Sequence, residues 1–164
     1  MEDKVELTDA FGEKAFIIQF LMKQTEVFKD RMDRLRSSEV STLIMVNDEV
    51  AGFVNLVREN RNYDFLFLDM FILEEYRSRK IGSKVFEILQ NEGIKDMIIA
   101  ETKQSNISAN KTANNCCVKL GCFEDRNIYL VQKDRLEEFI DNNYMEKLAK
   151  HYEKDSVKKL IREF

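Results

Sequence analysis

The chain has 164 residues, of which 44% are hydrophobic and 34% charged, and these figures fit a globular protein with a sizeable core. Its formal net charge of −4 argues against a general nucleic-acid-binding protein, and no apolar run approaches the roughly 20 residues that a membrane span needs. Because the acidic start shows no signal peptide and the cysteines form no disulfide framework, we expect a cytoplasmic protein.

The first half of the chain predicts a helical region, a β-hairpin and a central strand. Apolar residues recur at helical spacing over residues 10–36, which predicts one or two amphipathic helices. Two apolar runs, 42–46 and 50–57, flank the polar residues 47–49 and predict a hairpin with a short turn. The run 65–72 is strongly apolar and aromatic, which is typical of a central strand.

The second half predicts alternating helices and strands: a helix over 83–91, a strand over 97–100, a helix over 110–120 and two strand segments over 123–132. Gly93 and Gly121 follow the two helices and are typical stop signals. The last two strands are expected to turn near Arg126 and Asn127. The order predicts an α/β fold with a mixed sheet, antiparallel in its first half and then joined by a right-handed parallel strand–helix–strand crossover.

Residues 133–164 predict a helical C-terminal extension to a domain over residues 1–132, because apolar residues recur there at helical spacing. Two interpretations stay open: the extension packs on the same domain, or it forms a surface for a homodimer or another partner. The single histidine, His151, lies in this extension, and we expect it at the surface without a catalytic role.

The stretch from Phe71 to Leu89 carries the strongest functional signal. An apolar strand ends in a basic turn that contains Gly82, and a helix begins directly after it. This order brings free backbone amides together with basic side chains where a phosphate can bind. The basic side chains are Arg77, Arg79, Lys80 and Lys84. The alternative interpretation is a solvated basic helix start.

Residues 68–84, which read Leu-Asp-Met-Phe-Ile-Leu-Glu-Glu-Tyr-Arg-Ser-Arg-Lys-Ile-Gly-Ser-Lys, resemble the acetyl-CoA-binding motif of the GNAT N-acetyltransferases. That motif runs from a strand through Arg/Gln-x-x-Gly-x-Gly/Ala into a helix. Residues 110–122 are similar to the second motif of the family, Asn-x-x-Ala-x-x-x-Tyr-x-Lys-x-Gly-Phe. Two motifs in the family order are more specific than either alone.

The resemblance implies a GNAT fold over residues 1–132, acetyl-CoA as cosubstrate, no metal, and acetyl transfer to a primary amine. A small-molecule acceptor such as a polyamine or amino acid is expected rather than a histone-like tail, and the acidic balance weakly favours a cationic acceptor. The resemblance also implies that a backbone N–H near Phe71 polarises the thioester carbonyl. The cofactor-binding residues it implies are Phe71, Ile72, Leu73, Arg77, Ser78, Arg79, Lys80, Ile81, Gly82, Ser83, Lys84, Asn110 and Ala113.

Two positions depart from the motifs. Lys80 stands at the first glycine, so it strains the loop if that position needs a positive φ, although its ammonium can pair with a phosphate. Cys117 stands where the family has the tyrosine that protonates the departing thiolate. Cys117 is therefore either a shorter acid or a small buried core residue, and Tyr129 on the following strand is a substitute for the acid.

The remaining candidates are polar residues near the motifs. Asp69 is placed as in polyamine-type members of the family, which implies a general base acting through water or an anchor for an amine; otherwise it is a surface carboxylate or bonds a neighbouring loop. Glu101, at the end of the next strand, is a second acid. Asn110 is either a pantetheine ligand or a helix N-cap.

Two further functions are weighed against catalysis. The departures at Lys80 and Cys117 leave open a catalytically impaired acyl-CoA-binding sensor or regulatory module. The clustered cysteines, Cys116, Cys117 and Cys122, lack an accompanying histidine and do not read as a zinc site. A dimerisation protein built on the helical extension is the third hypothesis.

Overall fold

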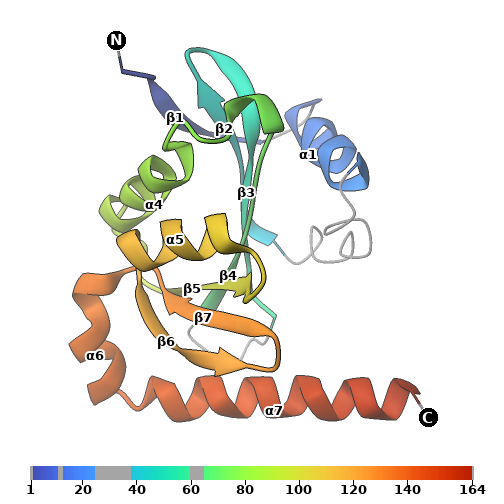
Figure 1. The fold of residues 1–164 in the computed structure, drawn as a ribbon, viewed down its shortest axis with the longest axis vertical. Coiled ribbons are helices and arrows are strands. Elements are labelled where there is room, and N and C mark those ends of the chain that lie inside the picture. Colours follow the sequence, from blue (N-terminus) through green and yellow to red (C-terminus); the bar gives the residue numbers. More distant parts are fainter. Residues whose placement is uncertain (1, 11–12, 25–37, 60–64, 164) are drawn as a thin grey trace.

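The structure, a computed structural model, describes residues 2–10, 13–24, 38–59 and 65–163 (Figure 1). Its centre is a seven-stranded sheet in the order β1-β2-β3-β4-β5-β7-β6. The strands are β1 (Val5–Asp9), β2 (Ser38–Val46), β3 (Glu49–Val57), β4 (Phe65–Ile72), β5 (Met97–Lys103), β6 (Val118–Phe123) and β7 (Arg126–Leu130). The helices are α1 (Glu13–Gln24), α4 (Ile81–Asn91), α5 (Ile107–Cys116), α6 (Leu136–Asp141) and α7 (Tyr144–Glu163), with short 3₁₀ turns η1 (Glu74–Tyr76) and η2 (Lys133–Arg135).

The sheet is mixed, as the sequence predicts. β1 to β4 pair in antiparallel fashion, β4 and β5 are parallel with α4 between them, and β5, β7 and β6 are again antiparallel. The hairpin around the Asn47-Asp48 turn and the central strand β4 are confirmed. The predicted helical region over 10–36 is confirmed as α1, and its residues 25–36 lie outside the described residues.

Helices cover both faces of the sheet. In Figure 1, α4 and α5 lie on one side of the central strands, and α1 lies on the other. Alternate residues of β4 and β5 enter different cores: Leu66 and Ile98 pack with α4, whereas Phe65, Phe67 and Met97 pack with α6 and α7. A third cluster joins α1 to β2 and β3. The cofactor motif and the C-terminal helices therefore serve opposite faces of the sheet.

The two parallel strands part soon after they begin. β4 and β5 pair only from Phe65 with Met97 to Phe67 with Ile99. Beyond that pair, β4 stays bonded to β3 as far as Ile72, and β5 stays bonded to β7 as far as Lys103. Each strand keeps its outer neighbour while the inner edges separate, so a V-shaped opening forms in the middle of the sheet.

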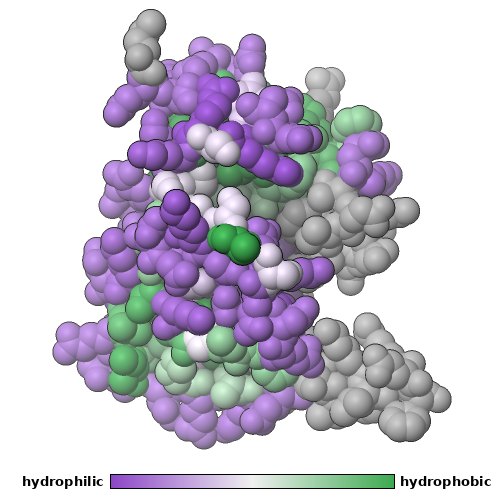
Figure 2. All heavy atoms as spheres, viewed as in Figure 1, coloured by the Kyte–Doolittle hydropathy of each residue, from purple (hydrophilic) through white to green (hydrophobic). Residues whose placement is uncertain are grey.

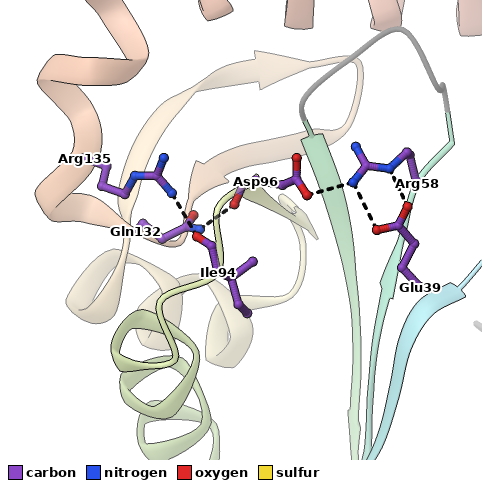
Figure 3. A network of polar contacts seen from close by, with 6 residues as sticks. All are labelled: Glu39, Arg58, Ile94, Asp96, Gln132 and Arg135. Atoms are coloured by element: carbon purple, nitrogen blue, oxygen red, sulfur yellow. Dashed lines mark hydrogen bonds and ion pairs between the residues drawn. The ribbon is translucent and has the colours of Figure 1, made fainter.

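A polar network holds the closed end of this opening (Figure 3). Arg58, just past β3, contacts Glu39 at 2.5 Å and Asp96, just before β5, at 2.7 Å. Gln132 donates to the carbonyl of Asp96 at 2.8 Å and accepts from the amide of Ile98 at 2.8 Å. These contacts tie the ends of β3, β5 and β7 together, so the strands diverge from a fixed point.

Three sequence predictions are wrong at element boundaries. The acidic start contains strand β1, for which no element was predicted; its Val5, Leu7 and Thr8 are partly buried, and Glu6 and Asp9 are exposed. The second predicted helix is shifted: α5 ends at Cys116, and Gly121 lies inside β6 rather than closing a helix. The last hairpin turns at residues 124–125 instead of near Arg126.

The expectation of a surface His151 is also wrong. Its side chain is only 12% exposed, its ring stacks on Phe67 at 4.7 Å between centroids, and Nε2 lies 3.1 Å from Glu59. Next to it, Tyr152 is buried against the same sheet face. The first half of α7 thus packs on the sheet, and the division of the chain at residue 132 stays a prediction.

The outer surface is largely hydrophilic on the side shown in Figure 2, and hydrophobic atoms gather toward its lower end near α6. Ile140 on α6 and Met145 on α7 are 57% and 42% exposed. Within the described ranges, none of the helices combines the length and apolar character needed to cross a membrane.

Replacing Gly52 with alanine tests the packing of β3 on β4. A Cβ there would lie 1.9 Å from the carbonyl oxygen of Phe71, which is backbone and cannot rotate away. We expect Gly52→Ala to lower the free energy of unfolding by at least about 2 kcal/mol in urea titrations. Gly121→Ala is the control, because a Cβ at Gly121 meets nothing within 4 Å. Equal stability of the two variants would contradict this packing.

Candidate active site

The inner edge of β4 offers backbone groups to the opening. The amide of Leu73 donates to Ala51 at 2.7 Å, and the carbonyl of Phe71 points at Gly52, so the odd-numbered residues here bond toward β3. Antiparallel strands alternate the direction of their backbone groups. The groups of Met70 and Ile72 therefore face the opening. The sequence analysis expected the amide that polarises the thioester carbonyl near Phe71. The strand register favours the amides of its two neighbours, Met70 and Ile72, for this role.

The turn after β4 presents a row of amides. The N–H groups of residues 78–83 have no hydrogen-bond acceptor within the described part of the chain, whereas Arg77 donates its own to Glu74 at 3.1 Å. Ser78 and Lys80 have positive φ angles of 64° and 60°. α4 begins directly afterwards without a side-chain cap or an acid in its first turn. Such amides at a helix start favour an anion.

The four basic side chains of the turn differ in their surroundings. Arg77 donates Nε to the carbonyl of Ile72 at 2.9 Å, which places its guanidinium at the open edge of β4. Arg79 pairs with Asp3 at 2.7 Å, and Lys84 donates to the carbonyl of Asp3 at 2.9 Å. Lys80 is exposed and makes no ion pair with any described residue. Only Arg77 and Lys80 of the predicted set are not engaged by the N-terminal segment.

Gly82 and Ala113 pack where α4 meets α5. A Cβ on Gly82 would lie 3.5 Å from Cγ2 of Thr112 and 3.6 Å from Cδ1 of Ile72, which is ordinary contact. Ala113 is 1% exposed. The structure therefore accommodates either glycine or alanine at position 82, as the family motif does, and Ala113 acts through packing.

Asn110 is the centre of a hydrogen-bond network rather than a free ligand. Its Oδ1 accepts from Thr102, from Asn127 at 2.8 Å and from Tyr129 at 3.1 Å, and its Nδ2 donates to the carbonyls of residues 103, 104 and 106. The N-cap interpretation of Asn110 is wrong, because Asn106 caps α5 by accepting from the amide of Ala109 at 3.1 Å. Asn110 instead fixes the start of α5 to the end of β5.

Cys117 lies in the core. It is 7% exposed and packs in the cluster under α4 and α5. Burial raises the pKa of the Cys117 thiol to about 12, so the thiol stays protonated at neutral pH. Of the two interpretations that the sequence left open, this environment favours the small buried core residue.

Two carboxylates stand at equivalent positions on the lips of the opening. Counting on from the Phe67–Ile99 pair, Asp69 on β4 corresponds to Glu101 on β5. Both belong to the face opposite α4 and α5, because side chains alternate along a strand. Asp69 is 3% exposed, and the fully buried Asn55 lies directly across from it on β3. The sequence could not settle which face Asp69 takes.

The C-terminal helix contributes to this site, which the sequence did not predict. Tyr152 on α7 donates to Oε1 of Glu101 at 2.5 Å, and Arg126 pairs with Oε2 at 2.8 Å. Burial and the Glu101 charge raise the pKa of Tyr152, so its hydroxyl remains a donor. The apolar residues of α7 at helical spacing predicted that the helix packs on something, but its contact with Glu101 depends on tertiary packing. No group of three or more His, Cys, Asp or Glu side chains is placed for a metal in the described residues.

Comparisons with known proteins agree with this geometry. Residues 7–116 match the family model described as "Acetyltransferase (GNAT) family". The microcin C7 self-immunity acetyltransferase MccE, solved with acetyl-CoA and AMP, is 13% identical, with a TM-score of 0.57 over 79% of this chain and 92% of that one. The N-acetyltransferase PseH of Campylobacter jejuni, solved with acetyl coenzyme A, is 16% identical, with a TM-score of 0.55 over 77% and 97%.

A third similar structure is the acetyltransferase that modifies the N-terminal serine of ribosomal protein L7/L12 in Salmonella typhimurium. It is 18% identical and aligns with a TM-score of 0.57 over 77% of this chain and 93% of that one. A search of curated protein sequences found no match.

Lys80→Gly tests the strain in the turn. A left-handed residue other than glycine costs about 1–2 kcal/mol, and glycine's extra backbone freedom offsets about 0.5–1 kcal/mol of the relief. We therefore expect Lys80→Gly to raise the free energy of unfolding by up to about 1 kcal/mol in urea titrations. Lys80→Ala, which loses the ammonium but keeps the Cβ at φ 60°, should leave stability unchanged. Equal values for the two variants would refute the strain.

Alkylation of the cysteines tests the burial of Cys117. Only a thiolate reacts with iodoacetamide, so at pH 8 the exposed Cys122 should be labelled at least about 100-fold faster than Cys117. Peptide mass spectrometry over time measures both rates, and labelling in urea, where the rates should converge, is the control. Comparable rates in the native protein would show that Cys117 is accessible to solvent and would make it a candidate acid again.

Proposed function

Because the chain is an acetyltransferase of the GNAT family, we propose that it transfers an acetyl group from acetyl-CoA to a primary amine of a small cationic acceptor. The observation that carries the proposal is the inner edge of β4, which beyond Phe67 has no strand partner among the described residues and leads directly into the turn, where the amides of residues 78–83 likewise have no hydrogen-bond acceptor in the described ranges. Coenzyme A combines an amide-bearing pantetheine arm with a diphosphate. The edge of β4 suits the arm, and the turn suits the diphosphate.

The cofactor side consists of backbone groups supported by two cations. The amides of residues 78–83 bind the diphosphate, and Arg77 and Lys80 add positive charge beside it. The backbone groups of Met70 and Ile72 pair with the pantetheine arm and orient the thioester carbonyl. Acetyl-CoA supplies the acyl group as an activated thioester.

The acceptor side lies on the opposite face, between the carboxylates of Asp69 and Glu101. An amine attacks a thioester only after it has lost its proton, so the site needs a proton acceptor near the nucleophile. Glu101 is already engaged by Arg126 and Tyr152. We assign the role of proton acceptor to Asp69, directly or through one water, because it lies on β4, the strand that orients the thioester, and we assign to Glu101 the electrostatic attraction of a cationic amine. Two carboxylates and the single cation Arg126 leave a net negative charge at the opening, which favours a cationic acceptor over a neutral one.

Tyr129 is the candidate for protonating the departing thiolate. Its side chain is buried in the same cluster as Cys117, and its hydroxyl donates to Oδ1 of Asn110 on the α5 side of the β5 lip. A second candidate function, an acyl-CoA-binding module without turnover, is favoured by the burial of Cys117, since the chain then lacks the usual acid of the family at that position. Binding and turnover distinguish the two functions.

A thiol-release assay with acetyl-CoA tests the proposal. The acceptor panel holds spermidine, free amino acids and a peptide with a free N-terminal serine, because a similar structure modifies such a serine. Spermidine is expected to be the best of the three. Asp69→Asn should lower kcat/KM by about 100- to 1,000-fold, the usual contribution of a general base, while CoA affinity stays within about twofold. Asp48→Asn, in the exposed hairpin turn, is the matched control.

The outcomes separate the hypotheses. CoA binding by calorimetry without turnover of any amine would support the binding module. A preference for the serine peptide would replace the small acceptor by a protein. Absence of CoA binding would reject both functions.

A further inference from the structure

The N-terminal segment before β1 is bound to the phosphate turn. The carboxylate of Asp3 accepts from Nε of Arg79 at 3.1 Å and from Nη2 at 2.7 Å, a two-pronged contact. The carbonyl of the same residue accepts from Nζ of Lys84 at 2.9 Å. One residue thus holds two of the four basic side chains that follow β4, although it lies more than 70 positions away in the sequence.

The segment has its own anchor, which makes it a fixed point for the turn. The backbone of Lys4 exchanges two hydrogen bonds of 2.9 Å with Asn47 in the β2–β3 hairpin turn. Nδ2 of Asn47 donates to Asp3 at 3.0 Å. Because these contacts do not involve the phosphate turn, the sheet and the hairpin position Asp3 independently of Arg79.

The phosphate turn needs such support. Ser78 and Lys80, the residues on either side of Arg79, both have left-handed backbones that are unfavourable for residues with a side chain. Strained residues of this kind persist only where their surroundings hold them. Within the described residues, Arg79 makes an ion pair with Asp3 and stacks on the ring of Tyr76 at 5.1 Å, and Tyr76 in turn donates to Glu49 at 2.6 Å.

We propose that Asp3 is a positioning residue for the cofactor: through Arg79 it holds the turn in the conformation that presents the amides of residues 78–83. The proposal rests on the proposed function, since it assumes that these amides bind the diphosphate. In this proposal Asp3 acts through Arg79 and is assigned no contact with the cofactor. Its negative charge opposes phosphate binding, but the carboxylate is neutralised by Arg79, and exposed charges are screened by salt. Support of the turn therefore outweighs repulsion.

Calorimetric titration with coenzyme A tests the proposal without depending on an acceptor. Asp3→Asn should weaken CoA binding by about tenfold, the size expected when one strained residue loses its support. Asp3→Glu, which keeps the carboxylate, should stay within about threefold of the wild type. Glu6→Gln is the matched control, because it also removes a carboxylate from the N-terminal part of the chain, and Glu6 makes its only ion pair among the described residues with Lys4. Circular dichroism should show the same melting temperature for all four proteins within a few degrees.

A double-mutant cycle shows whether Asp3 acts through Arg79. In an Arg79→Gln background, Asp3→Asn should have no further effect on CoA affinity. Unchanged or tighter CoA binding by Asp3→Asn would overturn the proposal, and tighter binding would make Asp3 a competitor of the phosphates. Additive effects in the cycle would also overturn it. These results leave the proposed function intact, whereas a wild-type protein that fails to bind CoA rejects the proposed function as well.

Discussion

The parting of β4 and β5 after the Phe67–Ile99 pair is the constraint on which the rest of the structure depends. Buried strand edges need hydrogen-bond partners, so an inner edge left open in the middle of a sheet is costly unless a ligand or water completes it. The opening is sustained because β3 and β7 hold the two strands from outside, and the Arg58 network fixes the end from which they diverge. Asp69 and Glu101 on one face of the opening, and Asn110 on the other, owe their places to this divergence.

The phosphate turn shows how a chain can keep a glycine geometry without the glycine. Lys80 occupies, with a left-handed backbone, the position that the family motif assigns to glycine; Ser78, two residues earlier, is also left-handed, although the motif has no glycine there. Two side chains of the turn fix it to its surroundings: Arg77 donates to the carbonyl of Ile72 at the edge of β4, and Arg79 donates to Asp3 in the N-terminal segment. The basic residues of the motif are therefore divided between two tasks, charge for the ligand and bracing of the backbone, which a motif alone does not distinguish.

Local patterns predicted most of the fold and located the turn to which we assign the cofactor. The β2–β3 hairpin, β4, α4 and the parallel crossover follow from short-range alternation, apolar runs and turn residues. The misses have a common cause, because tertiary contacts overrode local signals. β1 is short and partly polar, and pairing with β2 makes it a strand. Gly121 has the sequence context of a helix stop signal but lies inside β6. Glu101 and Tyr152 meet only because α7 returns across the sheet, and no spacing in the sequence encodes that return.

The aromatic face covered by α6 and α7 has a consequence for biosynthesis. Phe65, Phe67 and Met97 are made early, yet Phe139, Leu148 and Tyr152, which shield them from water, are translated after all seven strands. During translation this apolar face of the sheet therefore stays exposed to water until α6 and α7 have been made. Exposed apolar surface of this kind is recognised by chaperones and promotes self-association. The core under α4 and α5 also needs Tyr129 and Val131, so it is complete in the sequence only shortly before α6 and α7, which cover the other face.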